Sequence, residues 1–132
     1  MDAAQALADL TEISSQVVNV VIASATGEVL ATTIDDEGRA GRFTNLLLEL
    51  VNESDAARKE RGLETMTQLE AATLDGSIFV VRRDDVLVGA TTRPDPTVGL
   101  VFYDLKHCIR AIVEPDAAPA ASRRRKAADA TA

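Results

Sequence analysis

The sequence switches between two hydrophobic periodicities in a fixed order, and that order limits the folds open to the chain. Apolar residues recur at helical spacing over 3–15, 39–61 and 97–113, while β-branched runs occupy the two intervals between them. Two strands in the first interval and three in the second give helix, two strands, helix, three strands, helix within about 113 residues. This order predicts an α+β domain in which helices sandwich a five-stranded antiparallel sheet.

Turn residues place the strands within the two intervals. In the first interval, a hairpin is predicted around Gly27, which can adopt positive φ, with strands at 17–24 and 29–34. In the second interval, Asp75-Gly76 is a strong hairpin signal inside a three-stranded meander. The strands of that meander are predicted at 65–74, 78–82 and 86–92.

The first strand of the meander differs from the first strand of the chain. The run at 17–24 is apolar on both faces, which is typical of a central strand covered by helices. Gln68 and Glu70 instead interrupt the run at 65–74 with polar side chains. This strand is therefore not expected to be a fully buried central strand.

The long helix at 39–61 carries a second apolar feature beside its inner stripe. The acidic run Asp35-Asp36-Glu37 suits the positive end of the helix dipole, and Gly62 is a natural stop. Leu48 falls outside the stripe, beside Asn52 and Asp55, and is either an ordinary surface leucine or part of a contact surface covered by a partner. The inner stripe is predicted from Phe43, Leu47, Leu50, Ser54 and Ala57, widened by Leu46 and Val51.

Charge and composition exclude several classes of protein. The net charge is −7, and residues 1–114 hold 19 acidic and 10 basic residues, so binding to nucleic acid or to anionic membranes is not expected. From the residues at its start and its hydropathy we expect no signal peptide and no membrane span, and lone Cys108 cannot form an internal disulfide. We expect a cytoplasmic protein with a domain at 1–114 and a disordered tail at 115–132, in which Arg123–Lys126 is a basic cluster.

The chain offers little catalytic chemistry. His107 and Cys108 are helix neighbours and point about 100° apart, so they cannot act as a nucleophile and base pair. The run Asp35–Glu37 lacks the alternating ligand spacing of a calcium loop. Arginines at 39, 42 and 83 lie near element ends, where an arginine can reach a partner's phosphate, although solvated surface arginine is the commoner role. We expect no catalytic residue, cofactor or metal.

Four stretches resemble the Roadblock/dynein-light-chain domain, a member of the longin-like superfamily. Thr26–Ala31 is similar to the family's Gly-x-x-Leu-Ala hairpin, and Leu46–Leu50 lies where the family has its long helix. Asp75–Val81 resembles the family's central turn and strand. Thr97–Val101 resembles the start of its last helix, with Thr-Val here in place of Asn-Leu. The resemblance covers roughly residues 3–113.

The resemblance implies a non-enzymatic regulator or scaffold. Such proteins form homodimers through the long helix and the first strand of the meander, which joins two sheets into one. Many act on Ras-like small GTPases, and bacterial gliding-polarity regulators of the family stimulate GTP hydrolysis by their partner. On this basis we predict a dimer or partner interface formed by Leu48, Val51, Asn52, Asp55, Met66, Gln68 and Glu70.

An alternative is a small-molecule sensor or scaffold of the PAS or profilin-like type with no GTPase partner. That class also has a central antiparallel sheet with flanking helices. A sensor needs a cavity with converging polar groups, and the apolar stripes of this chain are mainly aliphatic. The sequence therefore favours the regulator or scaffold.

Overall fold

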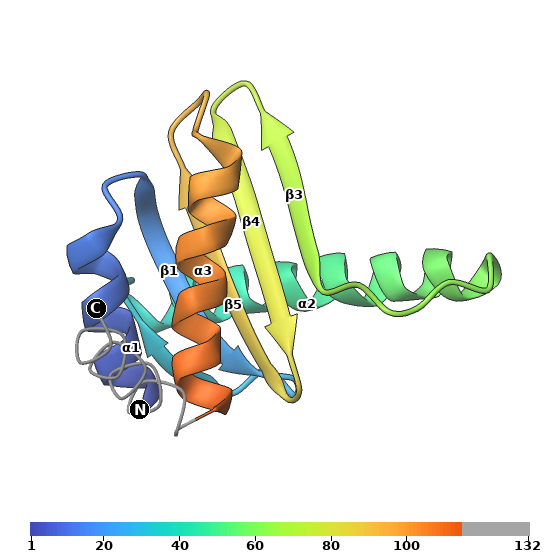
Figure 1. Cartoon of the computed structure of the whole chain (residues 1–132), viewed down its shortest axis with the longest axis horizontal. Coiled ribbons are helices and arrows are strands. Elements are labelled where there is room, and N and C mark those ends of the chain that lie inside the picture. The colour runs from blue at the N-terminus through green and yellow to red at the C-terminus, as the bar shows by residue number, and fades with distance from the viewer. Residues whose placement is uncertain (115–132) are drawn as a thin grey trace, which may run out of the picture.

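The element order matches the order predicted from the sequence. A computed structural model describes residues 1–114, so the tail predicted at 115–132 lies outside the described residues. The elements are α1 (Ala3–Ile13), β1 (Val17–Ser24), β2 (Val29–Thr32), α2 (Glu37–Glu60), β3 (Gln68–Thr73), β4 (Gly76–Arg83), β5 (Val86–Thr92) and α3 (Val98–Val113) (Figure 1).

The five strands form one antiparallel sheet in the order β2-β1-β5-β4-β3. β2 and β3 are therefore the two edge strands, and the predicted hairpin and meander are both present. β2 ends at Thr32, two residues before the predicted end: beyond it the Thr33 N–H still donates to the Val20 carbonyl at 3.0 Å, and threonine side chains make the other contacts with Val20. The Thr32 hydroxyl donates to the Val20 carbonyl at 2.8 Å, and the Thr33 hydroxyl accepts from the Val20 N–H at 2.9 Å.

Helices cover both faces of the sheet, which explains why its central strands are apolar on both sides. α1 and α3 cover one face and α2 crosses the other (Figure 1). Alternate residues of β1 point to opposite layers: Val20 and Ile22 face α1 and α3, and Val21 and Ala23 face α2. Phe79 of β4 is fully buried under α3, where its ring meets that of Phe102 edge-on at 5.0 Å.

α2 lies close to the sheet at a single glycine and then extends past it. Leu47 is fully buried, and a Cβ added at Gly89 of β5 would lie 2.3 Å from its Cδ1 atom, so only glycine fits there. The 24 residues of α2 span roughly 36 Å. Its C-terminal part extends beyond β3, the edge strand (Figure 1). No residue of α2 after Val51 is buried.

The buried stripe of α2 differs from the predicted stripe. Ser54 is half-buried and Ala57 is exposed, because this part of the helix has no sheet beneath it. Leu46 is 39% exposed rather than part of the stripe. Sequence periodicity does not indicate where the sheet ends, so it extended the stripe too far. The buried residues are Ala40, Thr44, Leu47 and Val51.

Aspartate caps fix where two of the helices begin. The Asp2 side chain accepts a hydrogen bond from the Gln5 N–H at 2.8 Å and so caps the start of α1. The Asp36 side chain accepts from the Arg39 N–H at 3.0 Å, and α2 consequently begins at Glu37, two residues before the predicted start. This hydrogen bond lowers the pKa of Asp36.

Candidate interaction surface

The outer edge of β3 presents backbone groups that no strand within residues 1–114 satisfies. β3 pairs only with β4. The Arg82 N–H donates to the Thr67 carbonyl at 2.9 Å, and along an antiparallel pair the residues that bond to the neighbouring strand alternate with residues that do not. The N–H and carbonyl groups of Gln68, Glu70 and Ala72 therefore point away from β4.

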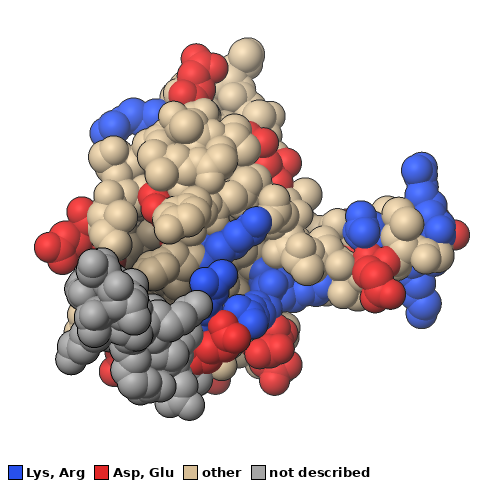
Figure 2. All heavy atoms as spheres, in the orientation of Figure 1, with Lys and Arg blue, Asp and Glu red and all other residues tan. Residues whose placement is uncertain are grey.

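The projecting end of α2 lies beside this edge. The chain leaves α2 at its far end and returns alongside it over residues 61–67 before β3 begins (Figure 1). Both charge signs gather over the projecting end (Figure 2). An open groove of about 360 Å³ runs between α2 and the start of β3, lined by Ser54, Ala57 and Leu69 among others. Leu63, in the return segment, is 51% exposed.

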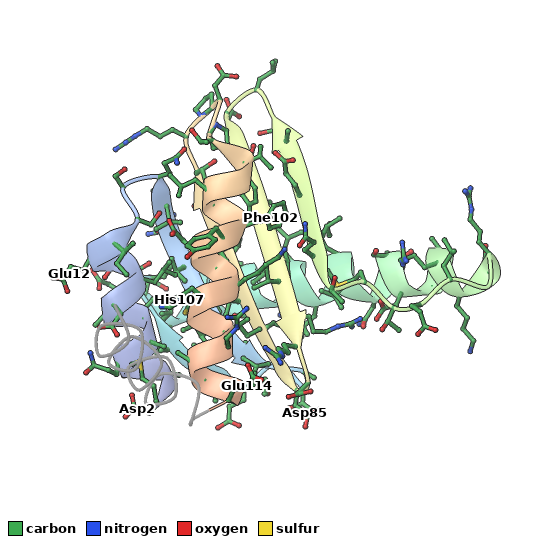
Figure 3. The ribbon with its side chains drawn as sticks, in the orientation of Figure 1. Asp2, Glu12, Asp85, Phe102, His107 and Glu114 are labelled. Atoms are coloured by element: carbon green, nitrogen blue, oxygen red, sulfur yellow. The ribbon has the colours of Figure 1, made fainter. Side chains whose placement is uncertain are left out.

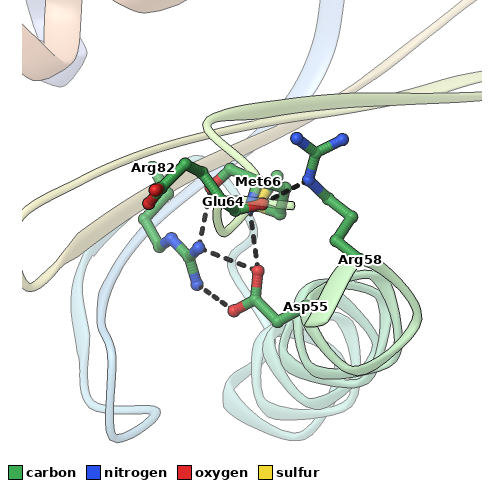
Figure 4. Close-up of polar contacts among 5 residues, drawn as sticks. All are labelled: Asp55, Arg58, Glu64, Met66 and Arg82. Carbon is green, nitrogen blue, oxygen red and sulfur yellow. Dashed lines mark hydrogen bonds and ion pairs between the residues drawn. The ribbon is translucent and has the colours of Figure 1, made fainter. Parts of the chain in front are cut away.

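A polar clamp fastens the return segment to both α2 and the sheet. Arg82 of β4 forms a bidentate pair with Asp55 of α2, with nitrogen–oxygen distances of 2.6 and 3.0 Å (Figure 4). Both partners hold Met66: Asp55 accepts from its N–H at 2.9 Å, and Arg82 donates to its carbonyl at 2.7 Å. Arg58 donates to the Glu64 carbonyl one turn further along α2. The clamp thus sets the position of β3 relative to the helix.

The clamp is largely enclosed, and this affects its electrostatics. The side chains of Arg82 and Asp55 are 18% and 24% exposed. The hydrogen bonds from Arg82 lower the pKa of Asp55, and the Met66 N–H acts in the same direction, while partial burial opposes both. Asp55 is therefore held ionised, and its charge is paired within the subunit.

Comparison with solved structures identifies the fold. A Roadblock/LC7 domain from Streptomyces avermitilis matches 87% of this chain and 97% of its own length, with a TM-score of 0.76 and 15% identity. This chain has the Roadblock/LC7 fold. The gliding protein MglB from Thermus thermophilus matches 85% of this chain and 86% of its own, with a TM-score of 0.72 and 14% identity. No protein-family model and no curated protein matches the sequence.

Two of the residues predicted for the interface are core residues of the Roadblock/LC7 fold. Val51 and Met66 are 2% and 5% exposed and lie in the layer between α2 and the sheet, so their side chains are not free to meet a partner. Leu48 is half-buried in contact with the same layer, and a Cβ added at Gly27 would lie 3.0 Å from its Cδ1 atom. Leu48 therefore lies over the β1–β2 turn and does not stand alone on the surface.

Of the other predicted interface residues, Asp55 is held in the clamp, and the remaining three are exposed on two different surfaces. Asn52 is exposed on α2. Gln68 and Glu70 are exposed on β3, but Gln68 lines a groove with α3, and Glu70 is opposite Phe79, which faces α3. The side chains of Gln68 and Glu70 thus lie on the face away from α2, whereas their backbone groups belong to the free edge.

Sequence reasoning missed Arg82 and Leu63. Arg82 is the second-last residue of the apolar strand β4, and that position was the only signal that it could reach a half-buried carboxylate. Leu63 follows the helix stop at Gly62 and carries no periodic signal.

The residues considered for chemistry have structural or surface positions. Cys108 is 4% exposed with its thiol 3.7 Å from the Ala6 carbonyl, and burial raises the pKa of this thiol to about 12. His107 is exposed on α3 (Figure 3). Within residues 1–114, no group of His, Cys, Asp or Glu side chains is arranged to hold a metal ion. In the same part of the chain, no helix combines the length and apolar character needed to cross a membrane.

Proposed function

We propose that the chain is a non-enzymatic regulator or scaffold that acts as a homodimer. The observation that carries the proposal is that α2 extends past a sheet edge whose outward backbone groups have no strand partner within residues 1–114. Antiparallel pairing of two β3 strands about a two-fold axis would make one continuous sheet of both subunits. The projecting end of each α2 would then lie over the partner's sheet rather than over solvent.

The structural relatives support this type of assembly. One of them is an MglB structure with a tetrameric arrangement, which matches 85% of this chain and 85% of its own with a TM-score of 0.73 and 14% identity. Leu46 on α2 and Leu63 in the return segment are exposed apolar side chains that a partner subunit would be able to cover. The proposed dimer would therefore form through the outward backbone groups of β3 and through side chains that are exposed in the single subunit.

The proposed partner of the dimer is a Ras-like small GTPase. Support comes from the fold shared with MglB gliding proteins and from the sequence resemblance to regulators of such GTPases. A non-enzymatic regulator would act by ordering the switch segments of the GTPase, which changes its hydrolysis rate or its placement in the cell. The two α2 helices, side by side in the dimer, would present the contact surface.

The dimer is tested by a proline placed on the free edge. Glu70→Pro removes an outward N–H and adds a ring at the centre of β3, and edge strands tolerate proline at such positions. Light scattering at high concentration should give a dimer for the wild type and a monomer for Glu70→Pro. The matched control Glu70→Thr keeps the N–H and should remain dimeric. A wild-type monomer, or a dimeric Glu70→Pro variant with native circular dichroism, would contradict β3 pairing.

The GTPase partner is tested separately. Co-purification from the native host, with GDP or a non-hydrolysable GTP analogue present, should recover a Ras-like GTPase in at least one nucleotide state. Its hydrolysis rate is then measured with and without the purified chain. Recovery of no GTPase in either nucleotide state would contradict the proposed partner. The proposed dimer would then be tested by the Glu70 variants alone.

A further inference from the structure

On the face of the sheet opposite α2, α3 leaves β3 uncovered. α3 lies over β5 and β4, and β3 runs clear of it (Figure 1). Between α3 and β3 is an open groove of about 350 Å³, lined by Gln68 on one side and by Phe102, Tyr103, Lys106, His107 and Arg110 on the other. The groove lies on the opposite face of the sheet from α2, and β3, whose outer edge the proposed dimer would pair, forms one of its walls.

At its apolar end the groove is lined by Phe102, which also packs against the core, and by Tyr103, which is largely exposed. α3 is anchored through a different face, which buries Val101, Leu105, Cys108 and Ile109. Tyr103, which lines the groove, is 69% exposed, and Leu100, on α3 outside the groove lining, is 49% exposed. Figure 2 shows an uncharged area over the upper part of α3.

At its other end the groove is lined by basic side chains, although the domain as a whole is acidic. Residues 1–114 hold 19 acidic and 10 basic residues, yet the groove lining includes Lys106 and Arg110 and no carboxylate. Within residues 1–114, Lys106 forms no salt bridge. Blue side chains adjoin the uncharged area in Figure 2, and Figure 3 labels Phe102 and His107 along the helix.

Two carboxylates lie near the groove without neutralising it. Glu114 is 3.9 Å from the Nε atom of Arg110, but its carboxylate is already bound to Arg83 at 2.8 Å. Glu70 is on the same face of β3 as Gln68, two residues away. Lys106 and Arg110 line the groove itself, whereas neither of these carboxylates does.

We propose that this α3–β3 groove binds an acidic segment of a partner protein. An apolar side chain of that segment would lie against Phe102 and Tyr103, and its carboxylates would pair with Lys106 and Arg110. Charge complementarity selects this occupant: the basic run Arg123–Lys126 of the chain's own tail has the wrong sign for the groove. Because the sheet lies between, the segment and a partner on α2 can be bound together.

Peptide display against the immobilised full chain provides the test. Selection of random peptides should enrich sequences that combine Asp or Glu with Leu or Phe. Fluorescence anisotropy then measures the affinity of an enriched peptide for wild type and variants. The double variant Lys106→Glu/Arg110→Glu should weaken binding about tenfold or more, because each lost charge-assisted contact affects affinity directly. Tyr103→Ala should weaken it severalfold without changing any charge.

A matched control distinguishes peptide binding in the groove from attraction of the peptide to the net charge of the protein. The double variant Arg39→Glu/Arg42→Glu makes the same change in net charge at exposed sites on α2, and it should leave the affinity of the peptide unchanged. All variants should keep the circular dichroism and the light-scattering mass of the wild type, so a failure of the proposed dimer would be seen separately.

Three results would overturn the proposal. The first is enrichment of no acidic peptide. The second is equal weakening by the Lys106/Arg110 and Arg39/Arg42 double variants, which would mean that only long-range charge is recognised. The third is a wild-type assembly larger than a dimer that is absent in Lys106→Glu/Arg110→Glu. This result would mean that a second copy of the chain, and not a partner protein, occupies the groove.

Discussion

Removing Arg82 tests whether the clamp, rather than apolar contact alone, holds β3 in place. Arg82→Leu keeps an apolar stem but removes three hydrogen bonds, two to Asp55 and one to the Met66 carbonyl. Asp55 is then left with a single partner, the Met66 N–H, at a site where its side chain is 24% exposed. The variant therefore loses favourable contacts and also leaves a charge partly buried and unpaired.

The expected loss of stability in Arg82→Leu depends on how deeply Arg82 and Asp55 are buried. Breaking a fully buried pair from one side costs about 3–5 kcal/mol, and a hydrogen bond to a charged group contributes about 1.5–3 kcal/mol. Because both side chains of this pair keep some contact with solvent, we expect roughly 2–3 kcal/mol in the free energy of unfolding. For a domain of this size that corresponds to a decrease in Tm of about 10 °C.

The neighbouring arginine provides the control. Arg83 pairs with Glu114 at 2.8 Å, but these side chains are 42% and 44% exposed. Exposed pairs contribute about 0–1 kcal/mol, so Arg83→Leu should change stability far less. Chemical denaturation at one fixed protein concentration measures both variants, because the stability of a dimer depends on concentration. Equal losses for the two variants, or less than about 0.5 kcal/mol for Arg82→Leu, would refute the reasoning.

The same pair predicts a pH dependence. The pKa of Asp55 is lower in the folded state than its ordinary value of 3.8, so ionised Asp55 stabilises the fold above that pH. The stabilisation is lost as the pH falls below 3.8 toward the folded-state pKa. The difference in unfolding free energy between wild type and Arg82→Leu should therefore be constant near neutral pH and become smaller in acid. A difference that grows on acidification would contradict this assignment.

Three further outcomes are expected. Gly89→Ala should destabilise the fold by about 1–3 kcal/mol in chemical denaturation, because its Cβ would clash with buried Leu47. Gly41→Ala, within α2 and with nothing within 4 Å of the added Cβ, should instead stabilise by up to about 1 kcal/mol; destabilisation there would show a contact that is absent from the structure. Cys108 should not react with a thiol reagent at about pH 8 until the protein is denatured, because burial raises its pKa to about 12.

Local patterns were enough to predict the element order and the turns. The apolar run of β1, the Asp75-Gly76 turn and the acidic start of α2 each depend on neighbouring residues, so the sequence contains the signal. The same holds for the mixed character of β3, whose position at the sheet edge follows from the strand order.

Features that depend on tertiary placement could not be predicted in this way. Helical periodicity identifies a face of α2 but not the point where the sheet beneath it ends, so Ala57 was placed inside and Val51 was placed in an interface. Leu48 was separated from the core because nothing local indicates that Gly27 lies beneath it. Arg82 and Asp55 are 27 residues apart, and their pairing appears only when β4 and α2 are brought together.

The clamp also couples the position of α2 to the position of the sheet edge. One half of the helix rests on the sheet, the other half projects freely, and Asp55 ties the helix to Met66, two residues before β3. A molecule that tilts the free half must also displace the beginning of β3. Thermodynamic reciprocity then requires that whatever occupies the strand edge change the affinity of that molecule by the same factor.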